Sequence, residues 1–231
     1  MSVGILIDFD DTLVQTTLYF EMAREKYARY MVKLGFPLEE VLDVLDRADI
    51  ENVHKYGGFL KECFPYAMAQ TYDHFCNIKK IKASDDARRK VEDMGWWVFD
   101  QPPGLIPGVG EALEELSADY PLYLATKGDP SVQLERVTRS GLTPFFEKIY
   151  VLKEKTHREY AEIAGAHMLI PGSSWVVGNS IKSDINPGLK AGFNCIYIPN
   201  QYTWHHEMEE PLGGHHTLET ISGVPSLVRG S

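Results

Sequence analysis

The sequence contains few cysteines, and none of them forms a short paired motif. Its three cysteines, Cys63, Cys76 and Cys195, include no CxxC pair, and their scatter among apolar residues is typical of reduced, buried thiols. This pattern excludes a disulfide-stapled secreted domain and favours a cytoplasmic protein.

Long apolar runs and a basic leader are also missing. A membrane helix needs a run of about 18 apolar residues, and no run in the sequence approaches that length, so we expect no association with a membrane. The segment from Met1 to Asp8 has no basic n-region and soon reaches an acidic residue, which argues against a signal peptide.

Basic residues are in deficit. The chain of 231 residues has 23 Lys and Arg against 33 Asp and Glu, a formal net charge of −10. Such a charge repels a phosphate backbone, so nucleic acid is not an expected partner. At roughly 150 residues per domain, the length corresponds to one domain with a large insertion or to two modest ones.

The apolar pattern predicts an α/β fold. Residues 3–7 read VGILI, an unbroken run that favours a strand buried on both faces. A long helical stretch follows, closed by a segment rich in proline and glycine at 100–108. Strands and helices then alternate, which predicts a parallel sheet. Its further strands are expected at 121–126, 148–151, 175–178 and 194–198.

The first strand therefore belongs to the same sheet as the later ones, and the helical stretch interrupts that domain. We expect a Rossmann-like parallel sheet core formed by residues 1–14 and 104–231. An all-helical cap domain, residues 15–103, is inserted after the first strand.

An acidic cluster, Asp8-Phe9-Asp10-Asp11-Thr12, follows the first expected strand. Ligands of open α/β sheets bind at the carboxyl ends of strands, and Mg²⁺ prefers carboxylate and carbonyl oxygens with waters. Asp8 could ligate a metal and present its free oxygen to an electrophile, while Asp10 acts from the other side as general acid or base. Asp11 is expected to join them around one cation. The alternative is a helix N-terminus that attracts acidic residues.

The sequence DFDDT at 8–12 resembles the first motif of the haloacid dehalogenase-like (HAD) hydrolases, and the resemblance covers nearly the whole chain. It implies that Asp8 is a nucleophile that becomes an aspartyl-phosphate. It also implies that Asp10 protonates the leaving group and later activates water. The family's dehalogenases lack an acid equivalent to Asp10, so its presence favours phosphoryl transfer.

Later motifs of the resemblance add the remaining candidates. Thr126, at the end of a strand, is expected to hold a phosphoryl oxygen, and the adjacent Lys127 to bind substrate. The motif lysine is Lys153 or Lys155. We favour Lys155 because it directly precedes the helix start at Thr156.

The fourth motif resembles GDxxxxD in the segment 178–184, where Asn179 replaces the first Asp and Asp184 is the second. The implied Mg²⁺ ligands are therefore Asp8, Asp10 through its carbonyl, Asp184 and Asn179. A competing transition-metal site would need His205-His206 or His215-His216 with Glu207 or Glu209, and we expect these histidines to be exposed loop residues.

The combined expectation is a Mg²⁺-dependent phosphatase that hydrolyses a small phosphorylated metabolite through an aspartyl-phosphate. Two alternatives stay open: a sugar phosphomutase with the same chemistry, and a catalytically weak binding or regulatory protein of the HAD fold. The cap should close over the site. The sequence does not indicate the oligomeric state.

Overall fold

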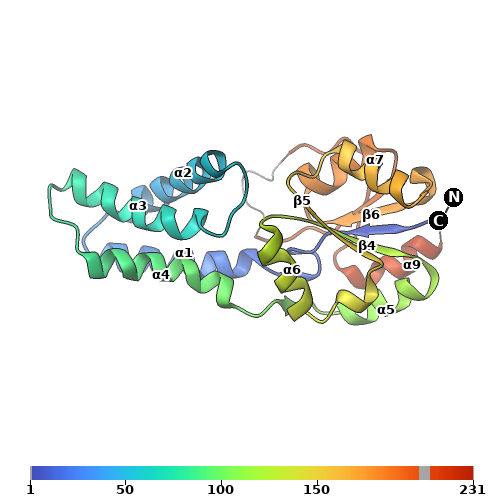
Figure 1. Cartoon of the computed structure of the whole chain (residues 1–231), viewed down its shortest axis with the longest axis horizontal. Helices are drawn as coiled ribbons and strands as arrows, with labels where there is room; N and C mark the ends of the chain where they lie inside the picture. Colours follow the sequence, from blue (N-terminus) through green and yellow to red (C-terminus); the bar gives the residue numbers. More distant parts are fainter. Residues whose placement is uncertain (1, 203–208, 231) are drawn as a thin grey trace. The chain divides into compact units, whose positions relative to one another are not determined.

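The computed structural model describes residues 2–202 and 209–230, and the statements below concern these residues. The chain divides into two compact units (Figure 1). The first combines Met1–Thr17 with Pro102–Ser231, and the second is Leu18–Gln101.

The first unit is built on a six-stranded sheet with the order β5-β4-β1-β6-β7-β8, and every neighbouring pair is parallel. The predicted parallel α/β core is thereby confirmed. The strands are β1 (Ile5–Ile7), β4 (Leu122–Lys127), β5 (Lys148–Leu152), β6 (Trp175–Gly178), β7 (Asn194–Tyr197) and β8 (His216–Thr217).

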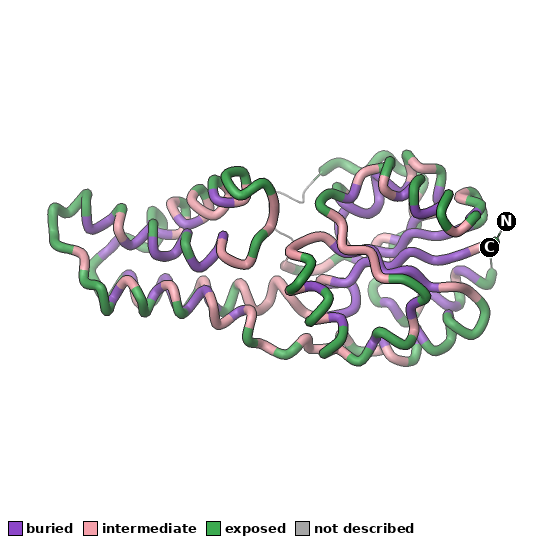
Figure 2. The backbone as a smooth tube through the Cα atoms, in the orientation of Figure 1, coloured by how far each residue is buried: buried purple, intermediate pink, exposed green. Residues whose placement is uncertain are grey.

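Strand β1 is buried on both faces, as its unbroken apolar run predicts. Ile5 and Ile7 pack into one hydrophobic core, and Leu6, which points the other way, packs into another. The first core includes residues of α5 (Val109–Asp119), α6 (Pro130–Arg139) and α9 (Val224–Arg229). The second includes α7 (His157–Ala166), with α8 (Asn186–Lys190) packed against it. The buried strands between these helices are visible in Figure 2.

Short helical turns complete this unit. Thr143–Phe145, Pro171–Ser173 and Ile221–Gly223 are 3₁₀ turns, and Ile181–Ile185 is a single π-helical turn that leads into α8.

The second unit is helical and has a hydrophobic core of its own. Its helices are α1 (Thr17–Lys33), α2 (Leu38–Tyr56), α3 (Cys63–Ile78) and α4 (Asp85–Asp100). Pro37 and Ser84 precede α2 and α4, and the Ser84 side chain accepts a hydrogen bond from the Ala87 amide. Within the described ranges, no helix combines the length and apolar character required to cross a membrane.

Two very short strands lie where the chain passes between the units. Strand β2 (Val14–Gln15) pairs antiparallel with β3 (Gly104–Leu105), both within the first unit. The sequence gives no strand signal here, because a two-residue strand is too short to show alternation.

Candidate active site

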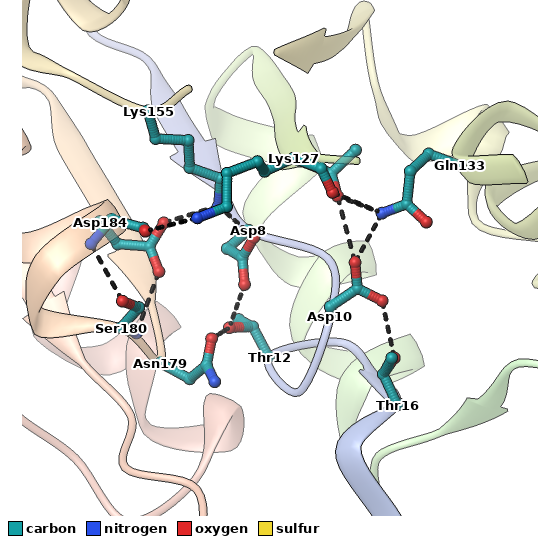
Figure 3. Close-up of polar contacts among 12 residues, drawn as sticks. Asp8, Asp10, Thr12, Thr16, Lys127, Gln133, Lys155, Asn179, Ser180 and Asp184 are labelled. Carbon is teal, nitrogen blue, oxygen red and sulfur yellow. Dashed lines mark hydrogen bonds and ion pairs between the residues drawn. The ribbon is translucent and has the colours of Figure 1, made fainter. Parts of the chain in front are cut away.

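The expected site residues lie where parallel strands end. Asp8 follows β1, Thr126 and Lys127 close β4, Lys155 comes three residues after β5, and Asn179 follows β6. Because all these strands run parallel, their carboxyl ends share one edge of the sheet. Figure 3 shows the side chains directed toward one another at this edge.

Lys155 is held by the start of α7. Thr156 caps this helix in a capping box with Glu159, whose carboxylate accepts from the Thr156 amide at 2.9 Å. The Lys155 side chain therefore enters the core, where only 6 % of the residue is exposed. Its ammonium donates to Asp8 and, at 2.8 Å, to Asp184 Oδ1. Lys153, the alternative lysine, is exposed.

Asp184 is surrounded by donors of the chain itself. Its Oδ1 accepts from Lys155 and, at 3.2 Å, from the Tyr160 hydroxyl, while Oδ2 accepts from the Ser180 amide at 3.0 Å. The carboxylate fits only because position 178 is glycine. A Cβ on Gly178 would lie 2.3 Å from Asp184 Cγ, far inside van der Waals contact.

Burial shifts the pKa values within the cluster of Asp8, Lys155 and Asp184. Burial, reinforced by Asp184 and Asp10, raises the pKa of Asp8 to about 8 against the opposing charge of Lys155. Burial lowers the pKa of Lys155, but Asp184 and Asp8 outweigh it and the pKa is raised. Two carboxylates against one ammonium leave the buried cluster one positive charge short when both acids are ionised.

Three oxygens gather beside Asp8 on the side away from Lys155. The terminal oxygen of Asn179 accepts from Thr12 Oγ1 at 3.3 Å and lies 3.0 Å from Asp8 Oδ2 and 3.1 Å from the Asp10 carbonyl oxygen. Turning the amide over lets its nitrogen donate to both oxygens instead. Facing oxygens of this kind suit a hard cation such as Mg²⁺, so this donor set fits the metal that the sequence implies.

The Asp10 side chain points toward α6. Its Oδ1 accepts from Arg136 and, at 2.6 Å, from the Thr16 hydroxyl, and its Oδ2 accepts from Gln133 at 2.5 Å and from Thr126 at 3.3 Å. Burial alone would raise the pKa of Asp10, but Arg136 and these hydrogen bonds outweigh it and the pKa is lowered. The Thr126 hydroxyl thus contacts the predicted acid/base.

Gln133 and Arg136 were not anticipated from the sequence. Gln133 is buried together with Val137 four positions later on the inner face of α6. An amide at a core position of an amphipathic helix is the available signal, because buried polar groups need partners. Arg136 follows Gln133 by three residues, on the same side of the helix.

The expectation that Asp11 joins the cation site is wrong. Its carboxylate accepts from the Thr16 and Thr17 amides and from the Thr17 hydroxyl, at the start of α1. Asp11 has a φ of 58°, and in this left-handed conformation its side chain points toward Thr16 and Thr17 and not toward the Asp8 carboxylate. Asp11 therefore stabilises a helix start, the alternative reading of this acidic cluster.

Lys127 lies beside the fourth-motif loop, and its ammonium donates to Ser183 Oγ at 3.2 Å. The competing histidines are only partly described: His205, His206 and Glu207 fall outside the described residues. His216 lies in β8 rather than a loop, and the half-buried His215 packs edge-on against Tyr197. Across the described ranges, no group of three or more His, Cys, Asp or Glu side chains is arranged to hold a metal ion.

Comparison with known proteins gives consistent relatives. A family model described as haloacid dehalogenase-like hydrolase matches residues 5–198. Glyceraldehyde 3-phosphate phosphatase of Methanocaldococcus jannaschii is 24 % identical, over 99 % of this chain and 98 % of its own length. N-acylneuraminate-9-phosphatase of Rattus norvegicus is 24 % identical, over 98 % of this chain and 93 % of its own length.

Solved structures share the fold. A haloacid dehalogenase-like family hydrolase from Xanthomonas campestris superimposes with a TM-score of 0.81, at 24 % identity, over 99 % of this chain and 96 % of that one. The putative HAD-hydrolase YfnB from Bacillus subtilis, solved with magnesium bound, gives a TM-score of 0.65 at 16 % identity, over 98 % of each chain. The strand-end site and the match across residues 5–198 agree that this chain belongs to the haloacid dehalogenase-like hydrolase family.

Proposed function

We propose that the chain is a Mg²⁺-dependent phosphatase that hydrolyses a small phosphorylated metabolite through an aspartyl-phosphate on Asp8. The observation that carries the proposal is the convergence of Asp8, Asp10, Thr126 and Lys155 at one edge of the sheet. Relatives named as phosphatases that align along almost the whole chain support the same reaction class.

In the first half-reaction, a carboxylate oxygen of Asp8 attacks phosphorus while the bond from phosphorus to the substrate oxygen breaks. Asp10 gives a proton to the departing alkoxide, a contribution of about 10²–10⁴ in rate for general acid catalysis. Because Arg136 and the hydrogen bonds lower the pKa of Asp10 in the free site, Asp10 must gain this proton when the substrate binds. Lys155 holds Asp8 and offsets phosphoryl charge, and Lys127 offers a donor to the phosphoryl oxygens. Thr126 can donate to them once its hydroxyl turns away from Asp10.

In the second half-reaction, Asp10 takes a proton from water as that water attacks phosphorus. The bond between phosphorus and Asp8 breaks, inorganic phosphate leaves, and both carboxyl groups return to their starting states. The same residue thus serves as acid and then as base, which requires that it can exchange protons with each successive reactant.

Mg²⁺ would be held by Asp8, the Asp10 carbonyl and Asn179, with Asp184 as a further candidate. When bound, it would neutralise negative charge on the phosphoryl oxygens. We place Asn179 before Asp184 because the Asn179 terminus lies about 3 Å from the oxygens of Asp8 and Asp10, whereas both oxygens of Asp184 accept from donors of the chain.

The test is phosphate release from a panel of esters with Mg²⁺, including p-nitrophenyl phosphate, glyceraldehyde 3-phosphate and N-acylneuraminate 9-phosphate. We expect turnover by the wild type, loss of turnover in Asp8→Asn, and loss on chelation of the metal that Mg²⁺ restores. Full activity of Asp8→Asn would refute the covalent mechanism. Isomerisation of a sugar phosphate without phosphate release would indicate a phosphomutase, and tight binding without turnover would indicate a binding protein.

A further inference from the structure

The Asp10 carboxylate is enclosed by more donors than a surface acid normally has. Among the described residues, its side-chain hydrogen-bond partners are Arg136, Gln133, Thr16 and Thr126. Figure 3 shows the Thr16 and Gln133 side chains directed at Asp10 from two sides. Only Thr126 belongs to the expected motif residues, so the other three contacts need their own explanation.

The donors are connected to one another as well as to Asp10. Arg136 Nη1 also donates to Gln133 Oε1 at 3.0 Å, and Arg136 Nη2 donates to Thr16 Oγ1 at 2.6 Å. Gln133 Nε2 donates to Thr126 Oγ1 at 2.6 Å. This closed network fixes the orientation of each donor, and a fully satisfied network rigidifies its members.

Arg136 is held by its surroundings independently of Asp10. Its guanidinium lies over the ring of Phe9, with 5.4 Å from Cζ to the ring centroid, and Phe9 is fully buried between the two motif aspartates in sequence. Only 14 % of the Arg136 side chain is exposed. The guanidinium is thus fixed beside the chain segment that carries Asp8 and Asp10.

We propose that Arg136 and Gln133 are positioning residues that hold the Asp10 carboxylate for its work at the leaving group. The inference rests on the proposed phosphatase function and adds two residues to it. Among the described hydrogen bonds, neither residue bonds to the Asp8 nucleophile and both bond to Asp10, while Gln133 also reaches Thr126.

The inference predicts that the activity lost on replacing Arg136 depends on the leaving group of the ester. A general acid matters most for a poor leaving group and little for an activated one, because p-nitrophenolate departs without help. We expect Arg136→Met to lower kcat/KM for phenyl phosphate about tenfold more than for p-nitrophenyl phosphate, because kcat/KM reports the first half-reaction, in which the ester oxygen leaves. Arg136→Lys should recover part of this loss, because lysine keeps the charge but not the forked geometry.

Two controls separate positioning from folding. Arg139→Met changes an exposed arginine on the same helix, paired only with Glu135 among the described ion pairs, and should leave both esters unaffected. In the Asp10→Asn background, Arg136→Met should add little further loss, since residues acting through one group are not additive. Equal loss of kcat/KM for both esters, or full additivity with Asp10→Asn, would overturn the inference.

A structural readout remains informative even without turnover. Crystal structures of the wild type, Arg136→Met and Gln133→Met should show the Asp10 carboxylate displaced from Thr16 in the variants only. An Asp10 side chain that keeps its place in both variants contradicts the inference. Absence of phosphate release by the wild type on every ester contradicts the proposed function instead, so the two failures are distinguishable.

Discussion

Lys155, in the loop before α7, and Asp184, in the π-helical turn before α8, are 29 positions apart and form a buried ion pair with 2.8 Å between Nζ and Oδ1. The same ammonium donates to Asp8, so one cation serves two buried carboxylates. The arrangement makes Lys155 a structural residue of the site as well as a candidate for charge stabilisation.

Replacing this lysine should harm stability and activity together. Lys155→Met leaves Asp8 and Asp184 without their cation, and breaking a buried pair by removing one partner costs about 3–5 kcal/mol. We expect a lower free energy of unfolding by urea denaturation and no detectable phosphate release. Lys153→Met removes an exposed lysine from the same loop and should match the wild type. Equal effects of the two variants would contradict the assignment of Lys155.

Asn179 should limit how tightly the site binds Mg²⁺. Its amide oxygen carries no full charge, whereas a carboxylate about 4 Å from a cation gains several kcal/mol at an effective dielectric of about 20, before desolvation is subtracted. We therefore expect Asn179→Asp to lower the dissociation constant for Mg²⁺ about tenfold or more, measured by calorimetry. Asn77→Asp adds the same charge on an exposed position of α3 and should change nothing. Unchanged affinity in Asn179→Asp would place the cation elsewhere.

The sequence predicts the features that depend on local chemistry. The β1 run, the helix start at Thr156 and the parallel core all follow from residues close together in the chain. Asp11 shows the limit of this reasoning. Its neighbours suggested a shared cation, but a single left-handed residue sends its side chain toward Thr16 and Thr17 instead.

Contacts between residues that are distant in the sequence are harder to predict from it. The pairing of Arg136 with Asp10 joins residues 126 positions apart, and no spacing rule connects them. Apolar residues at helical spacing predict one covered face for α1, and Tyr27 and Met31 are buried as this pattern indicates, whereas Met22 of the same pattern is exposed. The tertiary packing of the four helices determines which side of a weakly amphipathic helix is covered.

Gly178 should tolerate no side chain, because its missing Cβ leaves the space that Asp184 occupies. Gly178→Ala forces the carboxylate or the β6 backbone to move, and overpacking of this kind costs about 1–3 kcal/mol. We expect a lower unfolding midpoint in urea together with reduced phosphate release. Gly172→Ala is the matched control, since nothing lies within 4 Å of its added Cβ. A Gly178→Ala variant as stable and active as the control would show that Asp184 can shift without consequence.

A pH-dependent stability is expected in the helical unit at Asp49. Burial raises its pKa from 3.8 to about 7, reinforced by Asp46 and opposed by Arg24. Between those pH values the folded state binds more protons than the unfolded state, so the stability of the wild type falls as pH rises from about 4 to about 7. Asp49→Asn cannot ionise and should escape this loss. Thermal unfolding across this pH range should therefore show the two proteins converging near pH 4 and the variant more stable above about pH 7.

Glu51→Gln, which neutralises an exposed acid on the same helix, should follow the wild type throughout. A constant difference between Asp49→Asn and the wild type at every pH would show that Asp49 titrates alike in the folded and unfolded chain.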